Sequence, residues 1–238
     1  MVDAKPDISL AVSTVIFALR PDSGSGLGAL WIPLVRRTRD PFRELWALPG
    51  GWVAGDEALV DAASRNLLET TALEPTYLEQ LYAFGAVDRS PDRRVVSVVY
   101  WALVRPEEAE RAAESENVRW FRADDLPTLA FDHNRIVDYA LWRLRTKMEY
   151  SRIALAFLGR TFTLTELRRV HEAVLQRPLD PANFRRMVEP TLVPTDAVVS
   201  GGKHRPPRLY RYDESVRLVD NGPLGHSPSS PATKEQLP

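Results

Sequence analysis

One segment of this 238-residue chain is more informative than the rest: Gly51-Trp-Val-Ala-Gly-Asp-Glu57-Ala-Leu-Val-Asp-Ala-Ala-Ser-Arg65-Asn66-Leu67-Leu-Glu69-Thr70-Thr-Ala72-Leu73. Its second half has the spacing of an amphipathic helix, and Asp56 with Glu57 suits the first turn, where carboxylates meet the positive end of the helix dipole. Arg65 and Glu69 are four residues apart, so on a helix they form an exposed ion pair of small energetic value. Taken without its surroundings, the segment predicts a loop followed by a surface helix.

The spacing of this segment also resembles the Nudix box. In that motif Gly is followed after five residues by Glu, and after seven more by Arg-Glu-hydrophobic-x-Glu-Glu-x-Gly-hydrophobic. The residues that fall on this pattern are Gly51, Glu57, Arg65, Leu67, Glu69 and Leu73. Asn66, Thr70 and Ala72 stand where the pattern has Glu, Glu and Gly, and the preceding run Trp46-Ala-Leu-Pro-Gly-Gly51 is the usual approach to the motif. The resemblance implies a Nudix fold, an αβα sandwich with a mixed sheet.

The three departures from the motif affect its chemistry. Nudix hydrolases split a nucleoside diphosphate linked to another group, and their helix carries three carboxylates that hold divalent cations against the pyrophosphate. Such hard cations need several oxygen ligands. Asn66 is neutral and Thr70 offers only a hydroxyl, so Glu69 is the one carboxylate left at these three positions. We therefore predict ligand binding without a metal site or a required cofactor, and with little or no hydrolysis.

The rest of the first 150 residues carries the elements that such a sandwich needs. Alternating or β-branched runs predict strands at Ile8–Leu19, Ala29–Arg37, Tyr77–Val87, Arg94–Val104 and Asn117–Phe121. Asp132 is placed as the N-cap of a helix that runs through Tyr150. The apolar stripe of this helix is Ile136, Ala140, Leu144 and Lys147 or Met148. We expect these elements to form a first domain over residues 1–150.

Composition is that of an ordinary globular protein and excludes some kinds of site. The chain is 44% hydrophobic and 26% charged, and it contains no cysteine, which excludes disulfides and thiolate ligands. No apolar run approaches the length of a membrane span, and the N-terminus lacks a secretory signal. We therefore expect a cytoplasmic protein without membrane contact.

The net charge of −1 conceals an asymmetry along the chain. Residues 151–213 carry 11 Lys and Arg against 6 Asp and Glu, whereas residues 1–150 carry 18 against 23. An acidic first part and a basic second part indicate two domains, of which the second is suited to contact a polyanion.

The second domain, over residues 151–220, is predicted to be a winged helix. A short helix at Arg152–Leu158 precedes a capping box, Thr163-Leu-Thr-Glu166, which opens a helix to about Gln176. After a turn, Asp180 caps a third helix with Pro181 at its first position, which completes a helix-turn-helix. Two strands, at Thr191–Val199 and Arg208–Tyr212, then flank a Gly-rich basic tip. Residues 221–238 lack apolar periodicity and are expected to be a disordered tail.

In a helix-turn-helix the third helix enters the major groove by its N-terminal half. This predicts DNA contacts from Asn183, Arg185 and Arg186, together with Thr163 and Thr165 at the start of the preceding helix. The wing residues expected to grip the DNA backbone or minor groove are Lys203, His204, Arg205 and Arg208. Two alternatives stay open, since winged helices also mediate protein contacts and the same basic tip suits RNA.

The combination of a Nudix-like domain and a winged helix resembles the NrtR family, the Nudix-related transcriptional regulators of NAD metabolism in bacteria. The resemblance extends to about Asp213 and rests on the segments Asp40–Gly51, Leu129–His133, Arg177–Arg186 and Gly202–Pro206 with Leu209–Arg211. It implies a repressor of NAD biosynthesis genes that binds a palindromic double-stranded DNA operator as a homodimer. It also implies that the first domain senses ADP-ribose or a related NAD-derived nucleotide as effector.

The predicted effector-binding residues lie in and beside the Nudix-like segment. They are Arg36, Arg37, Gly50, Gly51, Arg65, Glu69 and Asp88, and each charged member could instead be part of a structural ion pair. His133 is expected in a helix cap region rather than as a catalytic base. The alternative function is an active ADP-ribose pyrophosphatase with a C-terminal oligomerisation module, which would need metal ligands from outside the helix, such as Asp88 or Asp92.

Overall fold

A mixed seven-stranded sheet forms the centre of the computed structural model, which describes residues 7–21, 28–73, 75, 77–111, 115–198 and 207–213. Its strands are β1 (Ser9–Pro21), β2 (Gly28–Arg36), β3 (Trp46–Ala47), β4 (Gly50–Trp52), β5 (Tyr77–Phe84), β6 (Val95–Val104) and β7 (Val118–Arg122). The main order is β3-β2-β1-β6-β5, with β4 paired to β1 and β7 paired to β2. β1 and β6 are parallel and the other pairs are antiparallel, which confirms the expected mixed sheet.

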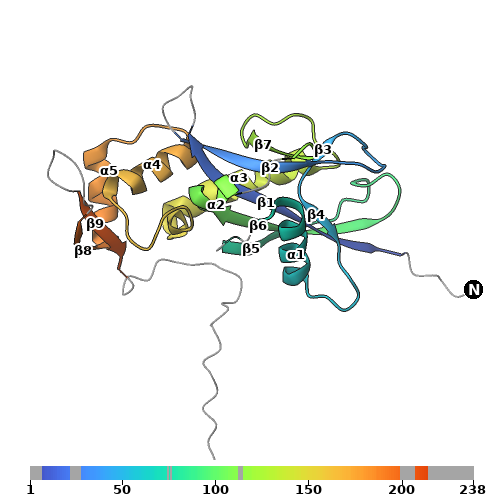
Figure 1. Cartoon of the computed structure of the whole chain (residues 1–238), viewed down its shortest axis with the longest axis horizontal. Helices are drawn as coiled ribbons and strands as arrows, with labels where there is room; N and C mark the ends of the chain where they lie inside the picture. The colour runs from blue at the N-terminus through green and yellow to red at the C-terminus, as the bar shows by residue number, and fades with distance from the viewer. Residues whose placement is uncertain are drawn as a thin grey trace, which may run out of the picture.

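Helices cover both faces of this sheet, because β1 and β6 carry apolar side chains on both (Figure 1). Phe17 and Trp101 belong to the cluster that also contains α3 (His133–Tyr150). Their neighbours Ile16 and Ala102 point to the opposite face, in the cluster that contains residues of α1 (Leu59–Thr71) and α2 (Pro106–Arg111). Alternation of this kind places successive residues of a strand in different layers. The result is the αβα sandwich that the sequence predicts.

The helix of the Nudix-like segment begins later than expected. Its N-cap is Ala58, so Asp56 and Glu57 precede the first turn instead of belonging to it. Its C-cap is Ala72, which takes the left-handed conformation with φ 56° and ψ 24° and donates its backbone N–H to the Leu68 carbonyl. Glycine adopts this conformation at little cost. The left-handed backbone therefore explains why the Nudix pattern has glycine at this position. Ala72 adopts the same conformation with the steric strain of its Cβ.

The second domain has the elements of a winged helix. They are η1 (Ile153–Phe157), α4 (Leu164–Leu175), α5 (Pro181–Val188), η2 (Glu189–Thr191), β8 (Leu192–Val198) and β9 (Arg208–Tyr212). The predicted capping box at Thr163 is present, and Asp180 accepts a hydrogen bond from the Asn183 backbone N–H. The first helix is a 3-10 helix, which sequence reasoning did not anticipate. In the parts of the chain that the structure describes, no helix is long and apolar enough to cross a membrane.

One hydrophobic cluster continues from the sheet into the winged helix. It includes Leu144 and Met148 of α3, residues of η1, and Leu167 and Val174 of α4. Polar contacts reinforce this junction, since Arg145 Nε donates to the Val174 carbonyl at 3.2 Å. At the start of β2, a Cβ on Gly28 would come within 3.4 Å of the Ala173 Cβ. The two domains therefore share a core, and α4 lies against the end of β2.

An ion pair is buried beneath this junction. Lys147 Nζ lies 2.6 Å from Glu79 Oε2, and the lysine side chain is 2% exposed. Its ammonium also lies 5.5 Å from the centroid of the Trp101 ring. The position that sequence reasoning placed in the apolar stripe of α3 is thus buried, and its charge is matched by a carboxylate on β5.

Replacing Ala72 by Gly is expected to raise the free energy of unfolding by about 1 kcal/mol, because glycine occupies the left-handed region without the steric cost of a Cβ. Urea denaturation followed by circular dichroism measures the change. Ala182→Gly is the matched control, since residue 182 lies within α5. There the same substitution should lower the free energy of unfolding by about 0.5–1 kcal/mol. A loss of stability in both variants would contradict this account of Ala72.

Candidate functional site

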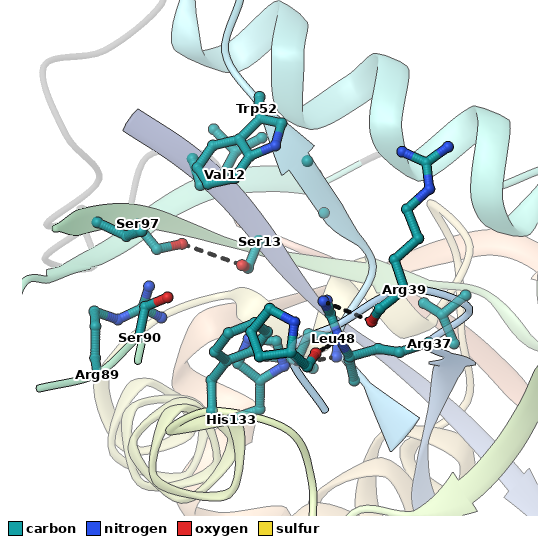
Figure 2. A pocket seen from close by; sticks show the side chains of 18 of the residues that line it. Val12, Ser13, Arg37, Arg39, Leu48, Trp52, Arg89, Ser90, Ser97 and His133 are labelled. Carbon is teal, nitrogen blue, oxygen red and sulfur yellow. Dashed lines mark hydrogen bonds between the residues drawn. The ribbon is translucent and has the colours of Figure 1, made fainter. Parts of the chain in front are cut away.

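A cavity of the first domain, about 450 Å³ in volume, lies where β1, β4 and the end of β2 meet the loop that follows β5 (Figure 2). The hydroxyls of Ser13 and Ser97 are 3.1 Å apart on its sheet wall, and Trp52 stands beside Val12 nearby. Five arginines and two aspartates contribute to the lining: Arg36, Arg37, Arg39, Arg89 and Arg93, with Asp40 and Asp92. The cavity is therefore suited to an anionic ligand.

Four of the seven predicted effector residues line this cavity, namely Arg36, Arg37, Gly50 and Gly51. The other three, Arg65, Glu69 and Asp88, are not among its lining residues. Arg65 makes two hydrogen bonds to Glu57, at 2.7 and 2.8 Å, and lies 3.5 Å from Glu69. This pairing raises the pKa of Arg65 and lowers the pKa of Glu57.

Arg36 and Arg37 hold the loop that borders the cavity. Arg36 pairs with Glu44 at 2.5 Å, and Arg37 Nε donates to the Pro41 carbonyl at 2.8 Å. Burial lowers the pKa of Arg37, with Asp40 opposing the shift. The loop contains left-handed backbone at Glu44, where φ is 71°. Strained backbone of this kind persists where the surrounding contacts fix it, and it gathers at functional sites.

Sequence reasoning missed several residues that the fold brings to the cavity. Arg39 and Arg93 line the cavity. Arg36 and Arg89 are engaged in ion pairs, whereas the ion pairs found in the described part of the chain do not include Arg39 or Arg93. The Arg93 guanidinium lies 5.5 Å from the centroid of the Trp52 ring, and Trp52 is 54% exposed. A large exposed aromatic ring beside arginines offers a surface for stacking a planar group. The one sequence signal for Arg93 is its place in the polar stretch Asp88-Arg-Ser-Pro-Asp-Arg93, which separates two predicted strands.

The residues at the Nudix positions do not fit a metal cage. Asn66 Nδ2 donates to the Ala62 carbonyl at 2.7 Å, and Thr70 Oγ1 donates to the Asn66 carbonyl at 2.5 Å. Both polar groups are thus engaged by the backbone of their own helix. Glu57 is held by Arg65. Among the described residues, no group of three or more His, Cys, Asp or Glu side chains could hold a metal ion.

The start of α3 is tied to the cavity wall. His133 is buried, and its Nδ1 accepts a hydrogen bond from the Leu48 backbone N–H at 3.0 Å. Asp132 occupies the N-cap position, but its side chain makes no capping hydrogen bond, which corrects its expected role. It instead receives two hydrogen bonds from Arg89, at 2.7 and 3.1 Å. Burial, opposed by Asp132 and aided by Arg89 and Arg37, lowers the pKa of His133 to about 3.

In the winged helix, α5 presents a polar face opposite its buried residues Phe184 and Val188. Arg185 lies 3.0 Å from Glu189, and Arg186 donates to the Asn183 side chain. The three predicted contact residues of α5 are therefore exposed together on one helix, as a groove-reading surface requires. The apolar character of Phe184, Met187 and Val188 predicts that all three belong to the core. Met187 is 61% exposed, so this prediction is wrong for Met187.

The remaining predicted DNA contacts are placed differently. Thr163 is buried, and its hydroxyl serves the capping box of α4, whereas Thr165 is exposed. Arg208 is exposed at the start of β9. Lys203, His204, Arg205 and the tail over residues 221–238 lie outside the described residues.

Two protein-family models match successive parts of the chain. Residues 10–140 match the model of the NUDIX domain, and residues 154–212 match that of the NrtR DNA-binding winged helix domain. A curated protein of Acinetobacter baylyi, named ADPR responsive transcriptional repressor NtrR, is 36% identical over 192 residues, which are 78% of this chain and 76% of that protein.

Of two further relatives, one matches most of the chain and the other matches about half of it. The crystal structure of Shewanella oneidensis NrtR complexed with a 27mer DNA superposes with a TM-score of 0.71 at 34% identity, covering 86% of this chain and 93% of that one. An ADP-ribose pyrophosphatase of Methanocaldococcus jannaschii is 34% identical over 113 residues, which are 47% of this chain and 67% of that protein.

The buried His133 predicts a pH dependence of stability. The unfolded chain protonates this imidazole near its ordinary pKa of 6.5, whereas the folded chain keeps it neutral down to a pKa of about 3. The folded state therefore loses stability as the pH falls below about 6.5. Between pH 7 and pH 5 the wild type should lose about 2 kcal/mol more than the His133→Gln variant. Urea denaturation at the two pH values measures this difference, and equal losses would refute the assignment.

Proposed function

The chain belongs to the NrtR family of Nudix-related transcriptional regulators, and we propose that it is a DNA-binding repressor whose Nudix domain senses ADP-ribose or a related NAD-derived nucleotide. The observation that carries this proposal is an arginine-lined cavity beside the Nudix helix α1. In α1 the Asn66 and Thr70 side chains donate hydrogen bonds to backbone carbonyls of the same helix. These features support nucleotide binding without a catalytic metal. NAD biosynthesis genes are the proposed targets.

The cavity supplies complementary groups for the pyrophosphate and the base of such a ligand. Arg39 and Arg93 provide charge for a pyrophosphate, and Trp52 provides a ring face for a base. Gly50 and Gly51 of β4 leave the backbone accessible from the cavity. A side chain does not fit at Gly50, because its Cβ would lie 2.3 Å from the Val12 backbone carbonyl oxygen. A Cβ at Gly51 would lie 2.2 Å from Asn66 Oδ1, so the Asn66 side chain would have to move.

Regulation follows from linkage between the two sites. If the nucleotide binds better to the arrangement that does not bind DNA, it weakens DNA affinity by the ratio of its two affinities, and DNA weakens nucleotide binding by the same factor. We expect a homodimer on a palindromic operator, because two recognition helices related by a two-fold axis match half-sites about one helical turn apart. A change in their separation would then lower operator affinity.

Operator binding is tested by fluorescence anisotropy with DNA from upstream of the chain's own gene and of NAD synthesis genes, with and without ADP-ribose. Sequence-specific binding that ADP-ribose weakens is the expected result. Absence of binding above the salt-sensitive, non-specific background would refute the regulator.

The recognition surface is tested by Arg186→Ala in the same assay. Loss of a base or phosphate contact should weaken operator binding by about 1–3 kcal/mol without unfolding the protein. Arg43→Ala is the matched control, because it removes an equal charge from an exposed residue of the first domain. Equal affinities of the two variants would count against α5 as the reading helix.

The alternative function is hydrolysis of ADP-ribose, which the Methanocaldococcus relative keeps open. Because the Nudix positions lack a carboxylate cage, we expect no turnover with Mg²⁺ or Mn²⁺, and a dissociation constant for ADP-ribose that EDTA leaves unchanged. Isothermal titration calorimetry and product detection by liquid chromatography measure the two quantities. Turnover at ordinary enzyme rates, on the order of 1 s⁻¹ or more, would establish the enzyme instead.

A further inference from the structure

One ion pair joins the cavity to the helix that leads to the winged helix. Arg89 lines the cavity and binds the Asp132 carboxylate through Nε and Nη2. The arginine side chain is buried, at 5% exposed, and the aspartate side chain is largely buried, at 18% exposed. A shielded pair with two hydrogen bonds holds its partners in a fixed geometry. Asp132 immediately precedes α3, so the pair fixes the position of that helix relative to the cavity.

The other end of α3 is attached to the winged helix. Its 18 residues span about 27 Å. Leu144 and Met148 share a core with η1 and α4, and Arg145 bonds the Val174 carbonyl of α4. Ser151, which follows α3 directly, accepts a hydrogen bond from the Ile153 backbone N–H of η1 at 3.2 Å. A displacement of α3 is therefore passed to the helix-turn-helix without an intervening flexible segment.

We propose that Arg89 is a further effector-binding residue, and that the anionic oxygens of the bound nucleotide compete with Asp132 for its guanidinium and so displace the start of α3. This inference rests on the proposed function of the cavity. A carboxylate that loses its cationic partner in a shielded place is costly, so Asp132 must move or find another partner. Because an unpaired Asp132 carboxylate is unfavourable at its original position, ligand binding at Arg89 moves Asp132 and the start of α3 with it.

Asp132 lines a second cavity as well as contacting Arg89. This cavity of about 640 Å³ lies on the side of β5, and its lining includes Arg135, which is exposed. In the structure Asp132 is paired with Arg89, and the proposal places its second arrangement toward Arg135 and water at the second cavity. An element with two discrete arrangements, each favoured by a different ligand, is the physical requirement for coupling two sites.

The variant Asp132→Asn removes the competing charge while it preserves the size of the side chain. The readout is the coupling ratio, defined as the dissociation constant of ADP-ribose with saturating operator DNA divided by that without DNA. For the wild type this ratio should be on the order of tenfold or more. In Asp132→Asn, ADP-ribose should bind more tightly without DNA, basal operator affinity should fall, and the coupling ratio should approach one.

Asp125→Asn is the matched control, because it removes the same charge from an exposed position that lines neither cavity. Its coupling ratio should equal that of the wild type. A wild-type ratio in Asp132→Asn would overturn the inference while leaving the proposed function intact. A wild type that binds neither DNA nor ADP-ribose, or binds both without coupling, would overturn the proposed function and this inference with it.

A second variant covers the case in which Asp132→Asn does not fold, as judged by circular dichroism. Arg89→Lys keeps the charge but loses the paired hydrogen bonds of a guanidinium. It should weaken ADP-ribose binding and reduce the coupling ratio. Hydrogen exchange of the wild type gives an independent readout, since ADP-ribose should accelerate exchange in the first turn of α3. Unchanged coupling in Arg89→Lys together with unchanged exchange would refute the role of this pair.

Discussion

The continuous hydrophobic core, from the parallel pair β1 and β6 through α3 to α4, is the constraint on which the rest of this structure depends. Because β1 and β6 are buried on both faces, the helices on either side have fixed positions, and the loops at the end of the sheet are held above a common cavity. Because α3 packs on the sheet and also on the winged helix, both domains are stabilised by the same hydrophobic core. The chain thus forms one packed body, which is what the proposed coupling between the cavity and α5 requires.

The fold was largely predictable because its signals are local. The apolar and β-branched runs of β1 and β6, the capping box at Thr163 and the Asp180 N-cap each depend on a few adjacent residues, and each is present in the structure. Met187 shows the limit of the same reasoning, because apolar character alone does not say which face of a short helix is covered.

The candidate site was less predictable because its groups come from distant segments. Arg39 and Arg93, in the loops that follow β2 and β5, meet Trp52 of β4 at one cavity because the sheet brings these segments together. Motif spacing marked Arg65 and Glu69, which the structure places in an ion-pair group beside the cavity lining. Asp132 shows a further limit, since its position predicted a cap and its partner, Arg89, lies 43 residues away in the sequence.

The buried Lys147 and Glu79 pair has a consequence for how this sequence can vary. Removing either charge alone would leave the other buried without a partner, at a cost of about 3–5 kcal/mol, a large part of the stability of a typical domain. Replacing both by apolar residues that fill the same volume would be nearly neutral or even stabilising. Positions 79 and 147 are therefore expected to co-vary among functional descendants of this sequence, with single exchanges removed by selection and joint exchanges retained.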